Sequence, residues 1–139
     1  MTPQQARERF VAARVARLAT ADAEGVPHLV PIVFAVDGDV VYSAVDAKPK
    51  RTTALRRLAN VEANPRVALL VDHYDDADWE ALWWVRADGH GRVLDPSDAE
   101  ARAAVSLLVP RYPQYRATPP AGPVLAVDVH HWLGWSALR

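Results

Sequence analysis

The segment from residue 40 to residue 74 limits the possible folds more than any other part of the chain. Two short apolar runs lie in it, at 40–45 and 67–71, and both are typical of strands buried in a sheet. Between them the sequence predicts one short helix, because the threonines at 52–53 can cap its start and Pro65 prevents its continuation. A strand, a basic turn, a helix and a second strand therefore follow one another within this segment.

Three cations lie just before or at the start of the predicted helix: Lys48, Lys50 and Arg51. The free N–H groups and the positive dipole end of a helix N-terminus make it a poor place for cations. A bound phosphate or carboxylate would supply the missing negative charge, whereas the alternative is an ordinary solvated turn. The expected core face of this helix consists of Ala54, Leu55, Leu58 and Ala59, and its expected solvent face consists of Arg56, Arg57 and Asn60.

Before this segment, the sequence predicts a helix and a β-hairpin. Thr2 caps the helix, Pro3 opens it, and it extends to about Arg14. The hairpin consists of a strand over 15–20, a turn over 21–25 and a returning strand over 26–36. Because Pro27 and Pro31 have no N–H group to donate, we expect the returning strand at a sheet edge or bulged, with backbone groups open to a ligand.

The second half of the chain predicts strands separated by one helix and a loop. Gly89 and Gly91 suggest a bulge in a long strand, and Ser97 with Glu100 has the spacing of a helix capping box. The predicted elements are a long strand over 82–94, a helix to about residue 109, a surface loop over 111–123, and two strands over 124–130 and 132–138.

Composition excludes several classes of protein. A length of 139 residues, half of them hydrophobic, favours one domain over residues 1–139 with a substantial core. The formal net charge of -1 argues against nucleic acid as a partner, and the absence of cysteine excludes disulfides and thiolate chemistry. The acidic loop at 72–80 lacks the spacing of a calcium loop, so we expect no metal site. We expect a cytoplasmic protein without a membrane span, because the N-terminal residues are charged and amphipathic.

Several strands with short interposed helices predict a mainly β (α+β) fold, an antiparallel barrel and not a βαβ sheet. Four stretches extend this prediction: ARLATADAEGVPHLVPIVF (16–34), YSAVDAKPKRTTALRRL (42–58), NPRVALLVDHY (64–74) and DWEALWWVRADGHGRVL (78–94). With the late Gly134-Trp135 pair, they make the sequence resemble the pyridoxamine 5'-phosphate oxidase-like, or flavin-reductase-like, split β-barrel proteins. Within these it resembles the actinobacterial branch that binds the deazaflavin coenzyme F420 in place of FMN.

The resemblance implies a cofactor site and a homodimer with that site at the interface. The phosphate would bind Lys48, Lys50 and Arg51, with the Thr52 hydroxyl as a further donor. The flavin ring would lie along the returning strand of the hairpin, at Val30, Pro31 and Ile32. Aromatic residues would form the wall of the ring site, for which this sequence offers Trp83, Trp84 and Trp135. For each tryptophan the alternative is a buried aromatic residue of the barrel.

The resemblance also implies an oxidoreductase in which the cofactor performs the chemistry. The chain lacks the C-terminal Arg-x-His arrangement with which the true oxidases hold pyridoxal phosphate, and has His130, His131 and Trp132 there. We assign the two histidines no catalytic role, and expect them to face opposite sides of a strand. The expected function is hydride transfer between coenzyme F420 and a small organic substrate. The alternatives are an FMN-dependent oxidase-like enzyme and a non-catalytic binding protein.

The charged tail of coenzyme F420 also favours this cofactor over FMN. Coenzyme F420 continues beyond its phosphate into a lactyl and polyglutamate tail, whose carboxylates need basic partners or open solvent. We expect arginines of the predicted helix and of the proline-rich loop to serve this tail: Arg56, Arg57, Arg111 and Arg116. Each exposed pairing contributes under about 1 kcal/mol.

Overall fold

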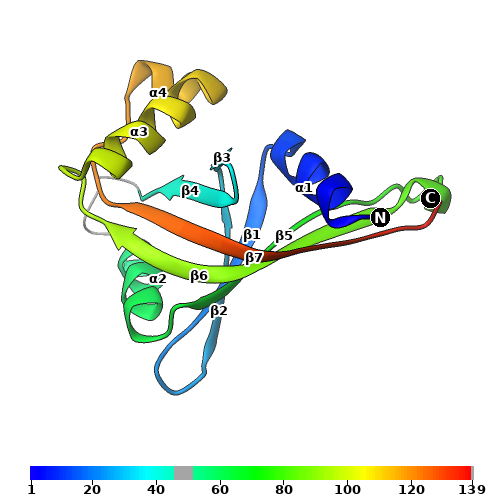
Figure 1. Ribbon diagram of the computed structural model, residues 1–139, viewed down its shortest axis with the longest axis horizontal. Helices are drawn as coiled ribbons and strands as arrows, with labels where there is room; N and C mark the ends of the chain where they lie inside the picture. The colour runs from blue at the N-terminus through cyan, green and yellow to red at the C-terminus, as the bar shows by residue number, and fades with distance from the viewer. Residues whose placement is uncertain (46–51, 139) are drawn as a thin grey trace.

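The computed structural model describes residues 1–45 and 52–138, with the backbone alone for residues 52–54 (Figure 1). Lys48, Lys50 and Arg51 of the predicted phosphate site, and the side chain of Thr52, lie outside the described residues. No helix in the described part of the chain is long and apolar enough to cross a lipid bilayer.

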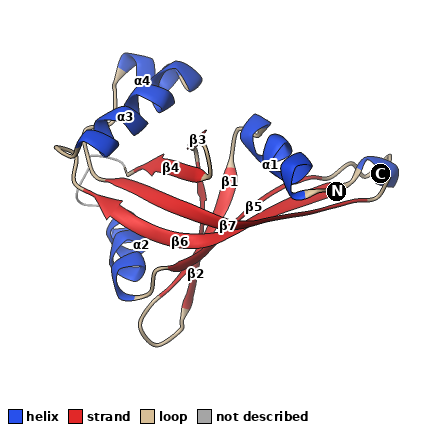
Figure 2. Cartoon of the chain, viewed as in Figure 1, coloured by secondary structure: helices blue, strands red, loops and turns tan. Residues whose placement is uncertain are grey.

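One sheet of seven strands forms the centre of the fold, in the order β2-β1-β5-β6-β7-β4-β3 (Figure 2). The strands are β1 (Ala16–Ala21), β2 (Pro27–Ile32), β3 (Ala35–Asp37), β4 (Val40–Ala44), β5 (Arg66–His73), β6 (Trp83–Leu94) and β7 (Val124–Ser136). The described ladders are all antiparallel. This arrangement confirms the predicted mainly β (α+β) class.

Short helices lie between and beside the strands. They are α1 (Pro3–Ala12), α2 (Thr52–Ala63), η1 (Trp79–Ala81), α3 (Ala99–Leu108), η2 (Val109–Arg111) and α4 (Pro113–Ala117). Figure 1 shows β5, β6 and β7 projecting together beyond the other strands, towards the side where both ends of the chain lie.

The first helix begins as predicted. The Thr2 hydroxyl accepts the Gln5 N–H, and the Gln5 side chain accepts the Thr2 N–H in return, so two of the free N–H groups at this end are satisfied. Phe10 on α1 is fully buried and packs against Phe34 and Trp132. This contact joins α1 to the main hydrophobic core.

The predicted core face of α2 is wrong. Leu55 is 52% exposed, whereas Asn60, expected in solvent, is buried and donates to the Thr20 hydroxyl of β1 at 3.1 Å. Val61, next to Asn60, is buried in the main core. A buried amide is stable here because a strand distant in sequence provides its acceptor.

Several predicted boundaries also need correction. The returning strand over 26–36 is two strands, β2 and β3, because the backbone of Phe34 does not join a ladder. Its N–H donates to the Tyr112 hydroxyl at 3.1 Å, and its carbonyl accepts Arg111 Nε at 2.9 Å. The loop over 111–123 contains α4, and the last two predicted strands are one strand, β7.

The predicted capping box at Ser97 and Glu100 is also wrong. Asp98 caps α3, and its carboxylate accepts the N–H of Glu100. The Glu100 side chain is bound instead by both terminal nitrogens of Arg92, at 3.0 and 2.9 Å, and by the Tyr42 hydroxyl at 2.7 Å. Arg92 also donates to Asp128 at 2.7 Å. The network therefore ties α3 to β4, β6 and β7.

This network makes an acid-sensitive contribution to stability. The Arg92 guanidinium and then the Tyr42 hydroxyl lower the pKa of Glu100 from its ordinary value of 4.5 to about 2. A carboxyl group whose pKa is lowered on folding stabilises the fold at pH values above its pKa in the unfolded chain. This stabilisation is lost as the pH falls from about 5 to 2.

We expect Glu100→Gln to cost about 1 to 2 kcal/mol of unfolding free energy at neutral pH, because the pair is partly exposed and screened by solvent. Urea unfolding at several pH values should show this difference from the parent chain shrinking between pH 5 and 2. Glu62→Gln is the control, because Glu62 is exposed and has no ion pair among the described residues. The same pH dependence in both variants would contradict this role of the network.

Candidate functional site

The register of the strands separates two faces of the sheet. Arg17 on β1 lies opposite both Pro31 and Leu70, Leu70 lies opposite Arg86, and Arg86 lies opposite Leu133. The neighbours of these residues, such as Leu18, are buried in the core. Because side chains alternate along a strand, the residues of this row lie together on one face of the sheet, which we call the outer face. It consists of Leu29, Pro31, Arg17, Ala19, Ala68, Leu70, Asp72, Trp84, Arg86, Asp88, His131, Leu133 and Trp135.

The predicted ring-site residues are divided between the two faces. Trp84 and Trp135 lie directly opposite each other on β6 and β7, and Pro31 shares their face. The side chain of Ile32 packs in the main core, and those of Val30 and Trp83 pack against it. The structure therefore brings together two of the three tryptophans, and leaves Val30 and Ile32 able to meet an outer-face ligand through their backbone.

The edge position of the proline-bearing strand is as predicted. β2 is the terminal strand of the sheet and pairs only with β1 among the described strands. Pro27 and Pro31 are exposed on this strand, and Leu29 between them is 67% exposed. The free edge therefore presents backbone groups beside apolar side chains.

Arg57 lies on α2, which follows the predicted phosphate segment in the sequence. Its side chain is partly buried, and its Nε is buried and has no hydrogen-bond partner among the residues that the structure describes. Burial lowers the pKa of the Arg57 guanidinium, while the nearby Tyr115 acts in the opposite direction. A buried guanidinium with an unpaired donor is unfavourable, so a bound anion would stabilise this site.

The proposed tail arginines have different environments. Arg111 is committed to the fold, because it donates to the carbonyls of Phe34 and Ala13, each at 2.9 Å. It is therefore not free to bind a tail, contrary to expectation. Arg116 is exposed and donates to the Pro110 carbonyl at 2.8 Å, and Arg56 is exposed.

A β-bulge creates a histidine cluster that the sequence did not predict. Asp88 lies opposite His131 and Gly89 lies opposite Val129, so His130 is the additional residue on β7. The bulge interrupts the alternation, and both histidines are exposed instead of facing opposite sides. Nδ1 of His90 contacts Nε2 of His130. A hollow of about 330 Å³ is lined by Arg66, Val67, Asp88, Gly89, His90, His130 and His131.

Gly89 explains why the two strands can approach at this point. A Cβ atom on Gly89 would lie 2.2 Å from the carbonyl oxygen of Asp128. Only a glycine fits so close to a neighbouring backbone. The glycine pattern was therefore a correct signal for the bulge.

The described residues include no group of three or more acidic or histidine side chains arranged to hold a metal ion.

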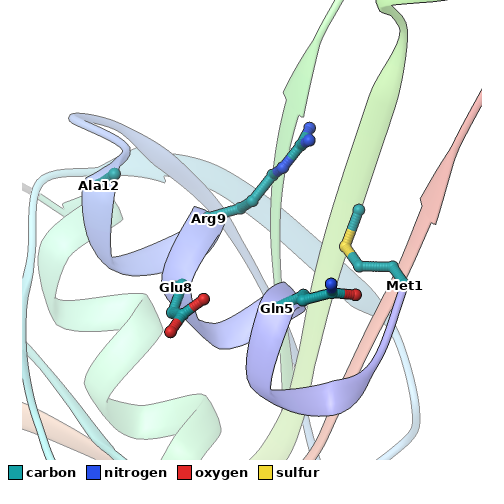
Figure 3. A pocket seen from close by; sticks show the side chains of 5 residues that line it. All are labelled: Met1, Gln5, Glu8, Arg9 and Ala12. Carbon is teal, nitrogen blue, oxygen red and sulfur yellow. The ribbon is translucent and has the colours of Figure 1, made fainter. Parts of the chain in front are cut away.

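Two further hollows lie along α1. The first is lined by Met1, Gln5, Glu8, Arg9 and Ala12 (Figure 3). The second, of about 490 Å³, lies between the end of α1, the start of β1 and the adjacent ends of β5 and β6. It is lined by Arg9, Ala12, Ala13, Arg14, Val15, Arg17, Val71, Asp72, His73 and Trp83. We call this second hollow the arginine groove. Nothing in the local sequence pattern identifies it, because its residues come from four elements.

A family model matches nearly the whole chain. The model of the pyridoxamine 5'-phosphate oxidase family matches residues 2–136. A curated relative is the 5a,11a-dehydrotetracycline/5a,11a-dehydrooxytetracycline reductase of Streptomyces rimosus, which is 33% identical over 86 residues. The match covers 62% of this chain and 59% of the reductase, so it spans less than two thirds of that relative.

Solved structures share the fold at low sequence identity. A conserved hypothetical protein of Mycobacterium tuberculosis has a TM-score of 0.75 at 20% identity, covering 99% of this chain and 86% of the other. An FAD-binding protein of Mesorhizobium loti has a TM-score of 0.72 at 21% identity, covering 96% and 94%. The haem storage protein HutZ of Vibrio cholerae has a TM-score of 0.72 at 15% identity, covering 98% and 95%. These likenesses confirm the predicted split-barrel fold.

Proposed function

The chain belongs to the pyridoxamine 5'-phosphate oxidase family of flavin-binding oxidoreductases, and we propose that it uses coenzyme F420 to transfer a hydride to or from a small organic substrate. The observation that supports the cofactor site is the buried Nε of Arg57, which has no partner within residues 1–45 and 52–138. Arg57 lies on α2, directly after the basic segment with Lys48, Lys50 and Arg51. The residues of this region therefore fit an anionic cofactor.

The arginines beside this region favour coenzyme F420 over FMN. FMN ends at its phosphate, whereas the tail of coenzyme F420 carries further carboxylates. Arg56, Arg57 and Arg116 are available to these carboxylates, and Arg111 is not. Several weak pairings together could give a tenfold preference or more, and this preference should shrink as salt rises.

The outer face would shield the chemistry. Bound and reduced, the deazaflavin supplies a hydride, and solvent supplies the accompanying proton. The apolar surfaces of Pro31, Trp84 and Trp135 would exclude water from the reacting atoms and orient the two rings. We assign no side chain to proton transfer. An activated carbon–carbon double bond, as in the name of the Streptomyces rimosus reductase, is the hydride acceptor that we propose.

We propose that a second copy of the chain covers the outer face. Leu29, Leu70, Leu133 and Trp135 are between 38% and 67% exposed on this face. An exposed face that carries several large apolar side chains marks an interaction site, and self-association in a two-fold dimer is the commonest solution. The dimer would place both cofactor sites at the interface.

Native mass spectrometry during titration with coenzyme F420 and with FMN tests cofactor and assembly together. We expect a dimer that binds one coenzyme F420 per subunit, about tenfold more tightly than FMN at low salt. Equal or tighter binding of FMN would return the protein to the FMN-dependent part of the family. A monomer at micromolar concentration would contradict the shared site.

A further inference from the structure

The arginine groove carries more positive charge than its own acidic residues balance. Three guanidinium groups line it, from Arg9, Arg14 and Arg17, and Asp72 is the one acidic residue in its lining. Within the described residues, none of the three arginines forms an ion pair. In contrast, Arg92 on β6 binds two carboxylates. The groove therefore has an excess of cations with unused donors.

Aromatic rings hold two of these guanidinium groups in place. The Arg9 guanidinium lies over the Trp83 ring at 5.0 Å, and that of Arg14 lies over the Tyr112 ring at 4.6 Å. Arg14 also donates to the Arg111 carbonyl. In Figure 3 the Arg9 side chain extends away from Glu8, so this neighbour does not neutralise it. Groups fixed in advance lose less entropy when they bind a ligand.

The groove adjoins the proposed ring site at two points. Arg17 lies directly opposite Pro31, and both belong to the outer face. Asp72, which lines the groove, lies directly opposite Trp84 on the outer face. A molecule lying against Pro31 and the tryptophan pair could therefore extend an acidic group towards Arg17.

We propose that the arginine groove binds an acidic group of the substrate, so that the substrate is an organic anion whose carboxylate or enolate pairs with Arg9 and Arg17. This inference rests on the proposed hydride transfer, because that reaction places a substrate against the outer face. Planar guanidinium groups match two adjacent anionic oxygens through paired N–H donors. The groove would then select charged substrates over neutral ones of the same shape.

The test compares 2-naphthoate with its neutral isostere 2-naphthamide by isothermal titration of the cofactor-free protein. We expect 2-naphthoate to bind about tenfold more tightly, since charged hydrogen bonds are stronger than neutral ones. Arg17→Gln should weaken 2-naphthoate about fivefold and leave 2-naphthamide unchanged. The Arg17 side chain is exposed and forms no ion pair in the described structure, so this variant should fold normally.

Arg102→Gln is the matched control, because Arg102 is an exposed arginine on α3, away from the groove. Equal binding of the acid and the amide would overturn the proposal, as would an equal effect of Arg17→Gln and Arg102→Gln.

A final titration uses protein saturated with coenzyme F420. Unchanged affinity for 2-naphthoate supports a substrate site, whereas its displacement would assign the groove to the cofactor tail and overturn the proposal. Failure of coenzyme F420 to bind would concern the proposed function alone, because the first titrations need no cofactor.

Discussion

Replacing Lys50 or Arg51 with Ala should weaken the binding of coenzyme F420 by about 1.5 to 3 kcal/mol, or roughly 10- to 150-fold. Each change removes one charged donor from a phosphate beside the start of α2, where the helix dipole alone cannot replace it. The free energy of unfolding should change little, because removing a cation from a helix N-terminus relieves an unfavourable charge. Fluorescence titration of the cofactor, with urea unfolding of the same samples, measures both quantities.

Arg102→Ala is the control for a general loss of positive charge. It should leave the titration curve of coenzyme F420 unchanged. If both Lys50→Ala and Arg51→Ala bound the cofactor as the parent does, the phosphate could not lie at this segment. Arg57, with its unpaired Nε, would then be the centre of a different anion site.

The second large effect is a loss of stability expected when the β-bulge between β6 and β7 is disturbed. Gly89→Ala should cost about 3 kcal/mol of unfolding free energy, because the new methyl group would lie 2.2 Å from the Asp128 carbonyl oxygen and 2.9 Å from its carbon. Both are backbone atoms, so no rotation of a side chain relieves the clash. The strands must separate, and the contact between His90 and His130 should be lost with them.

Gly91→Ala is the matched control on the same strand. Its Cβ would lie 2.8 and 3.3 Å from the two methyl groups of Val61, so it meets a side chain of α2 and not the backbone of a paired strand. We expect this variant to lose about 1 kcal/mol in urea unfolding. A loss for Gly89→Ala no larger than that for Gly91→Ala would show that the close approach at the bulge is not what requires glycine.

Local signals predicted much of the fold. Thr2 and Pro3 located the start of α1, the prolines of β2 indicated an edge strand, and Gly89 indicated the bulge. Each of these residues acts through its own backbone or its immediate neighbours. Their effect is therefore visible in a single sequence.

The failures share a different cause, which is a partner distant in sequence. Asn60 is buried because Thr20 accepts its amide, and Glu100 leaves its helix cap because Arg92 binds it. Arg111 is not free to bind the cofactor tail because it donates a hydrogen bond to the Phe34 carbonyl. No periodicity in the chain reports such contacts.

The candidate site shows the same division. The sequence alone proposed the basic segment and the tryptophans as site residues, but could not tell which tryptophans share a face. Register places Trp84 with Trp135, and turns Trp83 towards α1 and Arg9. The arginine groove was missed altogether, because four elements assemble it.

The most direct test of the account is anaerobic oxidation of reduced coenzyme F420 by a quinone such as menadione, followed by the returning absorbance of the oxidised deazaflavin. The quinone accepts a hydride from the cofactor and a proton from solvent, so no further reactant is needed. We expect the protein to accelerate this reaction above the rate in buffer, and Arg51→Ala to lose the acceleration at cofactor concentrations that saturate the parent. Firm binding of coenzyme F420 with no acceleration for menadione or any other acceptor would contradict the account and indicate a protein that only holds its cofactor.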